Sequence, residues 1–165
     1  MKSGITLIGF FFLVIFASPS LADPIGSETG LPLPRFVSLS SDEVNVRAGP
    51  GTRYPIKWVF VREGWPVEVI EEYEFWRQIR DIEGSIGWVH RNLISSRRTL
   101  IVTGETRAMY EDSDENSSVV LLAEPGVLGK LDECDGRWCE VDIAGISGWL
   151  MANHFFGVYE SEKVR

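Results

Sequence analysis

The stretch that decides the fold is VNVRAGPG, residues 44–51 of a chain of 165 residues. Its first four residues alternate apolar and polar side chains, which is the two-residue period of a β-strand. The Gly-Pro-Gly end cannot continue that strand, because proline has no backbone N–H and glycine admits positive φ values. The stretch is therefore predicted to be a strand that ends in a loop.

The same pattern of short strand-like runs that end in turns continues along the chain from Phe36 onward. Short runs of β-branched and aromatic residues are separated by turn signals, and several runs alternate with polar residues, as in residues 76–79. Beyond the N-terminal segment, no stretch of about ten residues has the apolar period of a helix. The body of the chain is therefore predicted to be all-β.

Rare residues recur in the same order at a nearly constant offset, which predicts two tandem modules, residues 36–97 and 98–160, and a short tail, residues 161–165. A module of about 60 residues is near the lower limit for a self-sufficient core, so its large aromatic residues are expected to be buried. The expected core tryptophans are Trp76, Trp88, Trp138 and Trp149. The recurring residues are Gly64 with Gly126 and Trp76 with Trp138 at an offset of 62, and Gly87-Trp88 with Gly148-Trp149 and Asn92 with Asn153 at an offset of 61.

The N-terminal segment is predicted to be a secretory signal peptide, residues 1–22. Lys2 is its only charge, and its apolar run of about 13 residues is shorter than the ~20 that a membrane-spanning helix needs. An uncleaved anchor is the alternative. After cleavage the chain is expected to be exported to the periplasm or the extracellular space, without spanning the membrane. Residues 23–35 hold three prolines and two glycines and are predicted to be a flexible linker.

The first module resembles the bacterial SH3-like domain family. The resemblance rests on residues 44–51, then Gly64, residues 75–76 and the closing Gly-Trp-Val of residues 87–89. The second module looks like a degenerate copy, because residues 106–110 lack the Gly-Pro-Gly while the later motifs are kept. The resemblance implies two tandem small SH3-like β-barrels. It also implies, by analogy with the family, recognition of cell-wall peptides.

The charge of the chain is unevenly divided. The net charge is −8, which argues against a nucleic-acid partner. Module one has 8 basic and 9 acidic residues, whereas module two has 4 basic and 12 acidic residues. A cell-wall ligand is therefore expected on module one. The alternative function is a periplasmic protein–protein adaptor, in which an envelope protein binds the acidic module two.

Two cysteines, Cys134 and Cys139, flank a predicted hairpin loop. A disulfide between them suits an exported chain, although two free thiols or a redox pair are alternatives. His90 and His154 are the two histidines, and neither stands in a recognisable catalytic motif. The chain is therefore expected to be non-catalytic, with no cofactor and no metal site.

Aromatic residues in module one exceed what a core of this size can hide, so some of them are expected to line an exposed groove. The alternative is that these rings cover the ends of the barrel. The residues predicted to bind the ligand are Arg47, Arg53, Tyr54 and Tyr73. The sequence thus favours an exported binding protein that recognises cell-envelope peptide or glycan of the peptidoglycan type.

Overall fold

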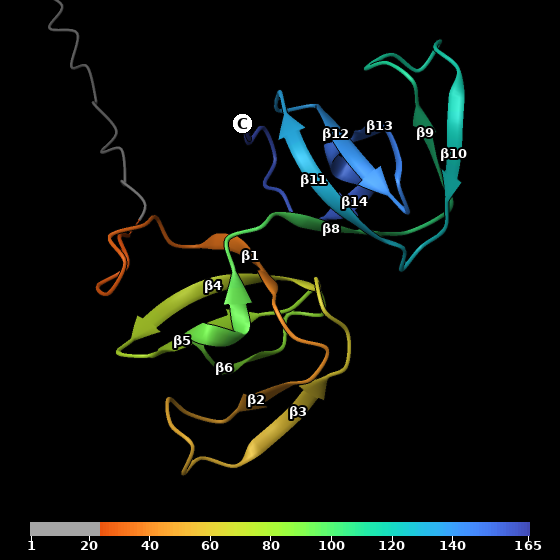
Figure 1. Ribbon diagram of the computed structural model, residues 1–165. Helices are drawn as coiled ribbons and strands as arrows, with labels where there is room; N and C mark the ends of the chain where they lie inside the picture. The colour runs from red at the N-terminus through yellow and green to blue at the C-terminus, as the bar shows by residue number, and fades with distance from the viewer. Residues whose placement is uncertain (1–23) are drawn as a thin grey trace, which may run out of the picture.

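A computed structural model describes residues 24–165, so the predicted signal peptide lies outside the described residues. This part of the chain forms two curved antiparallel sheets, one per module, joined by a short connection (Figure 1). None of its helices is long and apolar enough to cross a membrane. The prediction of an all-β chain with two SH3-like β-barrels is confirmed.

Both modules are seven-stranded sheets with the same strand order. In module one the order is β3-β2-β6-β5-β4-β1-β7, and in module two it is β10-β9-β13-β12-β11-β8-β14, so each strand has a counterpart seven strands later. Every pairing is antiparallel. In module one the elements are β1 (Arg35–Leu39), β2 (Val44–Arg47), β3 (Ile56–Phe60), β4 (Pro66–Tyr73), β5 (Trp76–Arg80), β6 (Ile86–His90), the 3-10 turn η1 (Arg91–Leu93) and β7 (Ile94–Ser95). In module two they are β8 (Thr99–Val102), β9 (Arg107–Tyr110), β10 (Val119–Ala123), β11 (Leu128–Cys134), β12 (Trp138–Ile143), β13 (Ile146–Met151), the 3-10 turn η2 (Ala152–His154) and β14 (Phe155–Phe156).

Each module has its own apolar core, built from the side chains that point inward at alternate positions along its strands. The two clusters share no residue, as expected if each repeat buries its own hydrophobic face. The core of module one consists of Leu33, Val37, Leu39, Val44, Val46, Val67, Val69, Ile79 and Val89. The core of module two consists of Leu100, Val102, Met109, Ala123, Leu131, Cys134, Cys139, Val141, Ile143, Leu150 and Phe155.

The glycines that precede tryptophan in β6 and β13 allow close approach between strands. A Cβ on Gly87 would collide with Val46 of β2, and a Cβ on Gly148 would lie 2.7 Å from the carbonyl oxygen of Tyr110. The repeated Gly-Trp of the sequence is thus a packing requirement in both modules.

The four tryptophans expected in the core divide into two pairs. Trp88 and Trp138 are buried, with 8% and 6% of their surface exposed, whereas Trp76 and Trp149 are only half-buried. Trp76 is partly exposed because it begins β5 at the hairpin end, where its ring stands edge-on to His90 at 5.4 Å.

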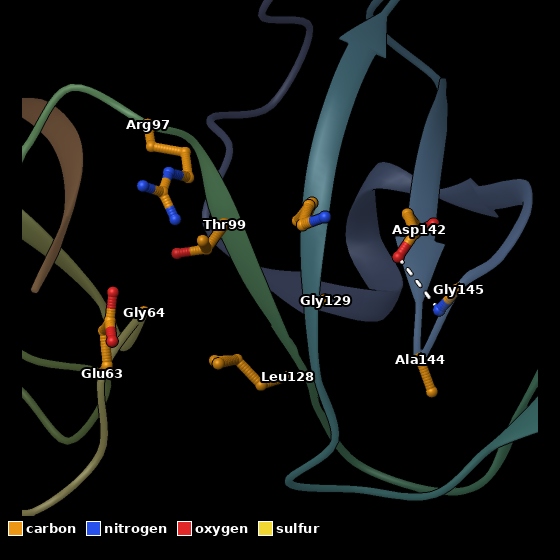
Figure 2. A pocket seen from close by; sticks show the side chains of 10 residues that line it. Glu63, Gly64, Arg97, Thr99, Leu128, Gly129, Asp142, Ala144 and Gly145 are labelled. Atoms are coloured by element: carbon orange, nitrogen blue, oxygen red, sulfur yellow. Dashed lines mark hydrogen bonds between the residues drawn. The ribbon is translucent and has the colours of Figure 1, made fainter. Parts of the chain in front are cut away.

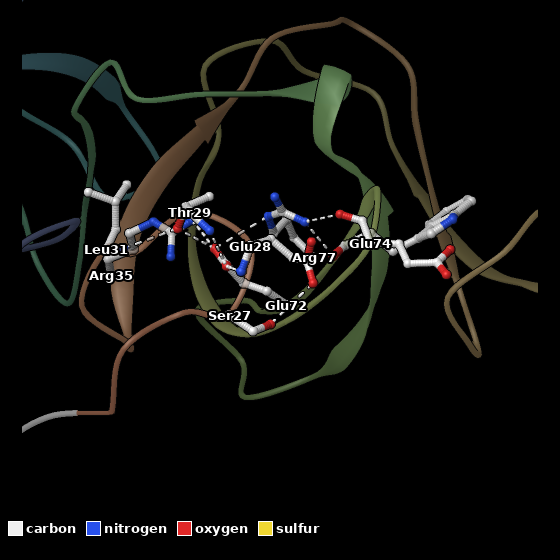
Figure 3. A network of polar contacts seen from close by, with 9 residues as sticks. Ser27, Glu28, Thr29, Leu31, Arg35, Glu72, Glu74 and Arg77 are labelled. Carbon is white, nitrogen blue, oxygen red and sulfur yellow. Dashed lines mark hydrogen bonds and ion pairs between the residues drawn. The ribbon is translucent and has the colours of Figure 1, made fainter.

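Residues 24–35, the described part of the predicted linker, differ from the flexible segment that their composition predicts. From Pro24 onward the segment turns back on itself, with a bridge between Ile25 and Pro32, and Leu33 is buried in the core of module one. The physical reason is a partner distant in sequence, because the turn wraps around the carboxylate of Glu72 in β4 (Figure 3).

Glu72 is fully buried and lies at the centre of this network. Its carboxylate accepts hydrogen bonds from the backbone N–H groups of Glu28 and Thr29, both at 2.9 Å, and from the Thr29 hydroxyl at 2.7 Å. The guanidinium groups of Arg35 and Arg77 lie at 2.8 and 3.5 Å. Burial raises the pKa of Glu72, but these hydrogen bonds outweigh it and hold the pKa at about 2.

The same hairpin position is cross-linked differently in the two modules. In module one, Glu72 and Arg77 face each other across the β4–β5 ladder and form the buried ion pair. In module two the matching ladder pair is Cys134 and Cys139, which form a disulfide. The predicted disulfide is confirmed, and it replaces an ion pair of the first repeat.

The two modules contact each other through an aromatic cluster. Phe36 of β1 packs against the rings of Phe156 and Tyr159 from module two, with centroid distances of 4.9 and 4.6 Å. The Arg98 guanidinium lies 5.7 Å from the centre of the Phe36 ring and is held by Glu162 at 2.7 Å. The short connection between the modules is therefore reinforced by packing.

The Glu72→Gln variant should lower the free energy of unfolding by about 3 kcal/mol near neutral pH. The folded pKa lies below the unfolded one, so the carboxylate stabilises the fold above about pH 4.5 and loses this effect as the pH falls toward 2. Urea unfolding between pH 7 and pH 2 measures both effects. Glu83→Gln, in an exposed turn, is the control and should change stability by under about 0.5 kcal/mol. An unchanged acid dependence in Glu72→Gln would contradict this role.

A double variant, Cys134→Ser/Cys139→Ser, should unfold about 2 kcal/mol more easily by the loop-length model for a short loop. It should also loosen the tail, because the backbone of Cys134 exchanges hydrogen bonds of 3.0 and 3.1 Å with Val164. Denaturant unfolding and amide hydrogen exchange at Val164 measure the two effects. Two titratable thiols in the denatured, unreduced chain would disprove the disulfide.

Candidate functional site

Module one carries a hollow of about 470 Å³ where the loop after β2 faces the end of the β4–β5 hairpin. One wall is the Gly-Pro-Gly loop that the sequence marks. The other wall is the hairpin end together with the last residue of β6. The lining residues are Pro50, Gly51, Thr52, Arg53, Glu74, Trp76 and His90.

The loop is shaped by Arg47 and Gly49. The Arg47 guanidinium donates hydrogen bonds to the carbonyl oxygens of Thr52 at 3.2 Å and Tyr54 at 2.8 Å, which fixes the loop from below. A Cβ on Gly49 would lie 2.6 Å from the Tyr54 ring, so the glycine allows that ring to lie flat on the loop. Arg47 therefore positions the loop, and its guanidinium is already occupied by backbone carbonyl groups.

Arg53 extends from the tip of the loop toward the hairpin. Its guanidinium stacks on the Tyr54 ring at 4.9 Å and donates a hydrogen bond of 3.2 Å to the Tyr54 hydroxyl. The pKa of Arg53 is raised, first by this hydrogen bond and further by the proximity of Tyr73 and Glu74. The structure thus brings Arg53, Tyr54 and Tyr73 to the same end of module one, where Arg47 holds the loop from below.

Beside the hollow lies a group of three rings, Phe75, Trp76 and His90, which we call the aromatic shelf. Phe75 and His90 are stacked with centroids 6.3 Å apart and an interplanar angle of 25°. Phe75 is 52% exposed, and the guanidinium of Arg91 lies 4.8 Å from its ring centre. His90 is oriented through its Nδ1, which accepts a hydrogen bond from the backbone N–H of Asn92 at 3.3 Å.

This combination suits binding of a flat or amphipathic ligand. Exposed rings stack on apolar faces of sugars and peptides, and guanidinium groups bind carboxylates and carbonyl oxygens. Within residues 24–165 no group of three or more His, Cys, Asp or Glu side chains is placed to hold a metal ion.

Module two presents a different surface at the corresponding position. By the repeat offsets, Phe75 corresponds to Arg137 and His90 to Met151, so two of the three rings of the shelf have no counterpart there, whereas Trp76 corresponds to Trp138. The hollow of about 670 Å³ at this end of module two is lined in part by the chain after β14, including Val158 and Ser161. Backbone atoms of Ser161 lie within 3.4 Å of where a Cβ on Gly136 would be.

Sequence reasoning missed the shelf as a group. Phe75 and His90 are distant in sequence and become neighbours through the pairing of Trp76 with His90 between β5 and β6. A usable signal was present in the repeat, because Phe75, His90 and Arg91 lie at aligned positions where the two modules differ. Positions that differ between otherwise matching repeats are not fixed by the packing that both repeats share, so they are candidates for a function of one module.

A family model described as a bacterial SH3 domain matches two segments of the chain, residues 40–96 and residues 103–154. The chain belongs to the bacterial SH3 domain family. The two matches fall on the two sheets, so each module is a bacterial SH3 domain, and the resemblance inferred from the sequence motifs is confirmed.

Other similarities to known proteins are more distant. The chain is 25% identical over 127 residues to the putative N-acetylmuramoyl-L-alanine amidase YrvJ of Bacillus subtilis (strain 168), covering 70% of this chain and 24% of that protein. The chain thus spans about a quarter of that relative. Among solved structures, NlpC1 and NlpC2 from Trichomonas vaginalis each share 10% identity, with TM-scores of 0.36 and 0.35. They cover 84% and 74% of this chain and 51% and 47% of their own chains.

Proposed function

We propose that this chain is an exported, non-catalytic binding protein whose first SH3 module recognises cell-envelope peptide or glycan of the peptidoglycan type. The observation that carries the proposal is the aromatic shelf at the hollow, with Arg53 lining the hollow and Arg91 against the Phe75 ring. Such a surface offers stacking and carbonyl or carboxylate binding together.

The comparisons support the ligand class. The Bacillus subtilis relative is named as an N-acetylmuramoyl-L-alanine amidase, and N-acetylmuramoyl-L-alanine joins a sugar to an amino acid. A surface with an exposed Phe75 ring and a guanidinium beside it suits a ligand that has both a sugar and a peptide part.

Two observations favour binding over catalysis. Both cysteines are committed to the disulfide, so neither thiolate is free to act as a nucleophile. The Nδ1 of His90 accepts a backbone hydrogen bond, and no serine, threonine or carboxylate side chain is hydrogen-bonded to its ring among the described residues. A catalytic base normally has a nucleophile within hydrogen-bond reach.

The second candidate function is a protein–protein adaptor that acts through module two. The observation in its favour is the charge, since that module has 12 acidic and only 4 basic residues. An acidic surface repels anionic polymers and attracts a basic protein partner. This function predicts salt-sensitive capture of a basic envelope protein and no retention on purified wall material.

A co-sedimentation assay with purified peptidoglycan tests the first function. The wild-type chain should be retained, and Phe75→Ala/Arg91→Ala should lower the affinity by about 10-fold, because it removes one exposed ring and one guanidinium. Leu122→Ala is the control, since Leu122 is 65% exposed on module two. Equal retention of the double variant and the wild type would exclude the shelf as the site.

The assay also separates binding from turnover. Wall fragments released by the wild type and lost in His90→Ala would disprove the non-catalytic proposal. Complete absence of retention of the wild-type chain would favour the adaptor instead.

A further inference from the structure

A second hollow, of about 420 Å³, lies between the two modules and is distant from the aromatic shelf. Module one contributes the turn before β4, with Glu63 and Gly64, and the connection between the modules contributes Arg97. Module two contributes the start of β8 and the hairpins beside it, including Thr99 and Leu128. We call this hollow the intermodule cleft (Figure 2).

The cleft contains a buried polar atom with no partner. Thr99 is only 5% exposed, and its hydroxyl oxygen forms no hydrogen bond with any described residue. Figure 2 shows this hydroxyl pointing into the space between Arg97 and Glu63. A buried hydroxyl without a partner loses its hydration without compensation, so a ligand that bonds to it would remove that cost.

Two opposite charges flank the hydroxyl without neutralising each other. Glu63 and Arg97 both line the cleft, and neither forms a salt bridge in the part of the chain that the structure describes. Leu128 adds an apolar surface that packs against Gly64 of the other module, 3.1 Å from where a Cβ on that glycine would be. The cleft thus presents two carboxylates, Glu63 and Asp142, two cations, Arg97 and Lys130, one hydroxyl and an apolar wall.

We propose that the intermodule cleft binds a small zwitterion, namely an amino acid or the free ends of a short peptide. The ligand carboxylate pairs with the Arg97 guanidinium, its ammonium group pairs with Glu63, and the Thr99 hydroxyl donates a hydrogen bond to the carboxylate. A small side chain rests against Leu128. The volume of the cleft suits a ligand of one or two residues. This site does not depend on the function proposed for the aromatic shelf.

Amide NMR titration of the purified chain with the dipeptide alanyl-alanine tests the proposal. The signals of Gly64, Thr99 and Leu128 should shift, with a dissociation constant in the millimolar range because the two charged groups are exposed to solvent. The N-acetylated dipeptide and the dipeptide amide each lack one charge. Each should bind about 10-fold more weakly.

Variants assign the groups. Glu63→Gln should lower the affinity for alanyl-alanine by about 10-fold and leave the affinity for the N-acetylated dipeptide unchanged. Arg97→Gln should lower the affinity for alanyl-alanine by a similar factor and leave the affinity for the dipeptide amide unchanged. Thr99→Val removes the hydroxyl at nearly constant side-chain shape and should lower the affinity for all three dipeptides. The matched control Glu83→Gln should leave alanyl-alanine binding unchanged.

Unchanged signals at Thr99 and Gly64 over the whole titration would disprove the site. Equal affinity for the free and the blocked dipeptides would disprove the zwitterion as its ligand. Because Glu63 and Arg97 are exposed, their variants keep the fold, and the dispersion of the amide spectrum verifies this.

Discussion

The structure of module one depends on the burial of one carboxylate. A fully buried Glu72 would be costly in a small core unless every lone pair found a donor. The donors come from the turn at residues 27–29, from Arg35 at the start of β1 and from Arg77 in β5. A single side chain therefore ties residues 24–34, β1 and the β4–β5 hairpin together, and that carboxylate fixes the turn at residues 27–29.

Module two cross-links the same position of its hairpin with different chemistry. The matching hairpin pair is Cys134 and Cys139, and a covalent bond replaces the ion pair. The segment that docks at this position follows module two in the chain, since the backbone of Val164 pairs with that of Cys134. In both repeats the end of the β-hairpin carries a cross-link and binds a segment that flanks the module. The disulfide needs no buried charge, so Val164 docks at this hairpin through backbone hydrogen bonds and apolar packing against the core.

The strands and the repeat could be predicted from the sequence because both are local or periodic signals. The alternation in residues 44–47 and the recurrence of Trp76 as Trp138 depend on nearby residues and on a fixed offset. The order of residues 24–34 could not be predicted, because a segment rich in proline and glycine carries no information about a carboxylate about 44 residues away. The role of Arg47 was hidden for a similar reason, since its partners are carbonyl groups of the loop and not side chains.

The candidate site follows from where the two repeats diverged. A shared core restricts the inward-facing positions of both modules, so change accumulates at the hairpin ends and in the loops. In module one these positions became Phe75 and His90 and stayed open to solvent, whereas in module two the corresponding residues are Arg137 and Met151 and the C-terminal tail lies beside them. The intermodule cleft has another origin, because neither module alone contains it. It requires the packing of Phe36 against Phe156 that holds the modules together, so duplication created a surface that a single SH3 domain does not have.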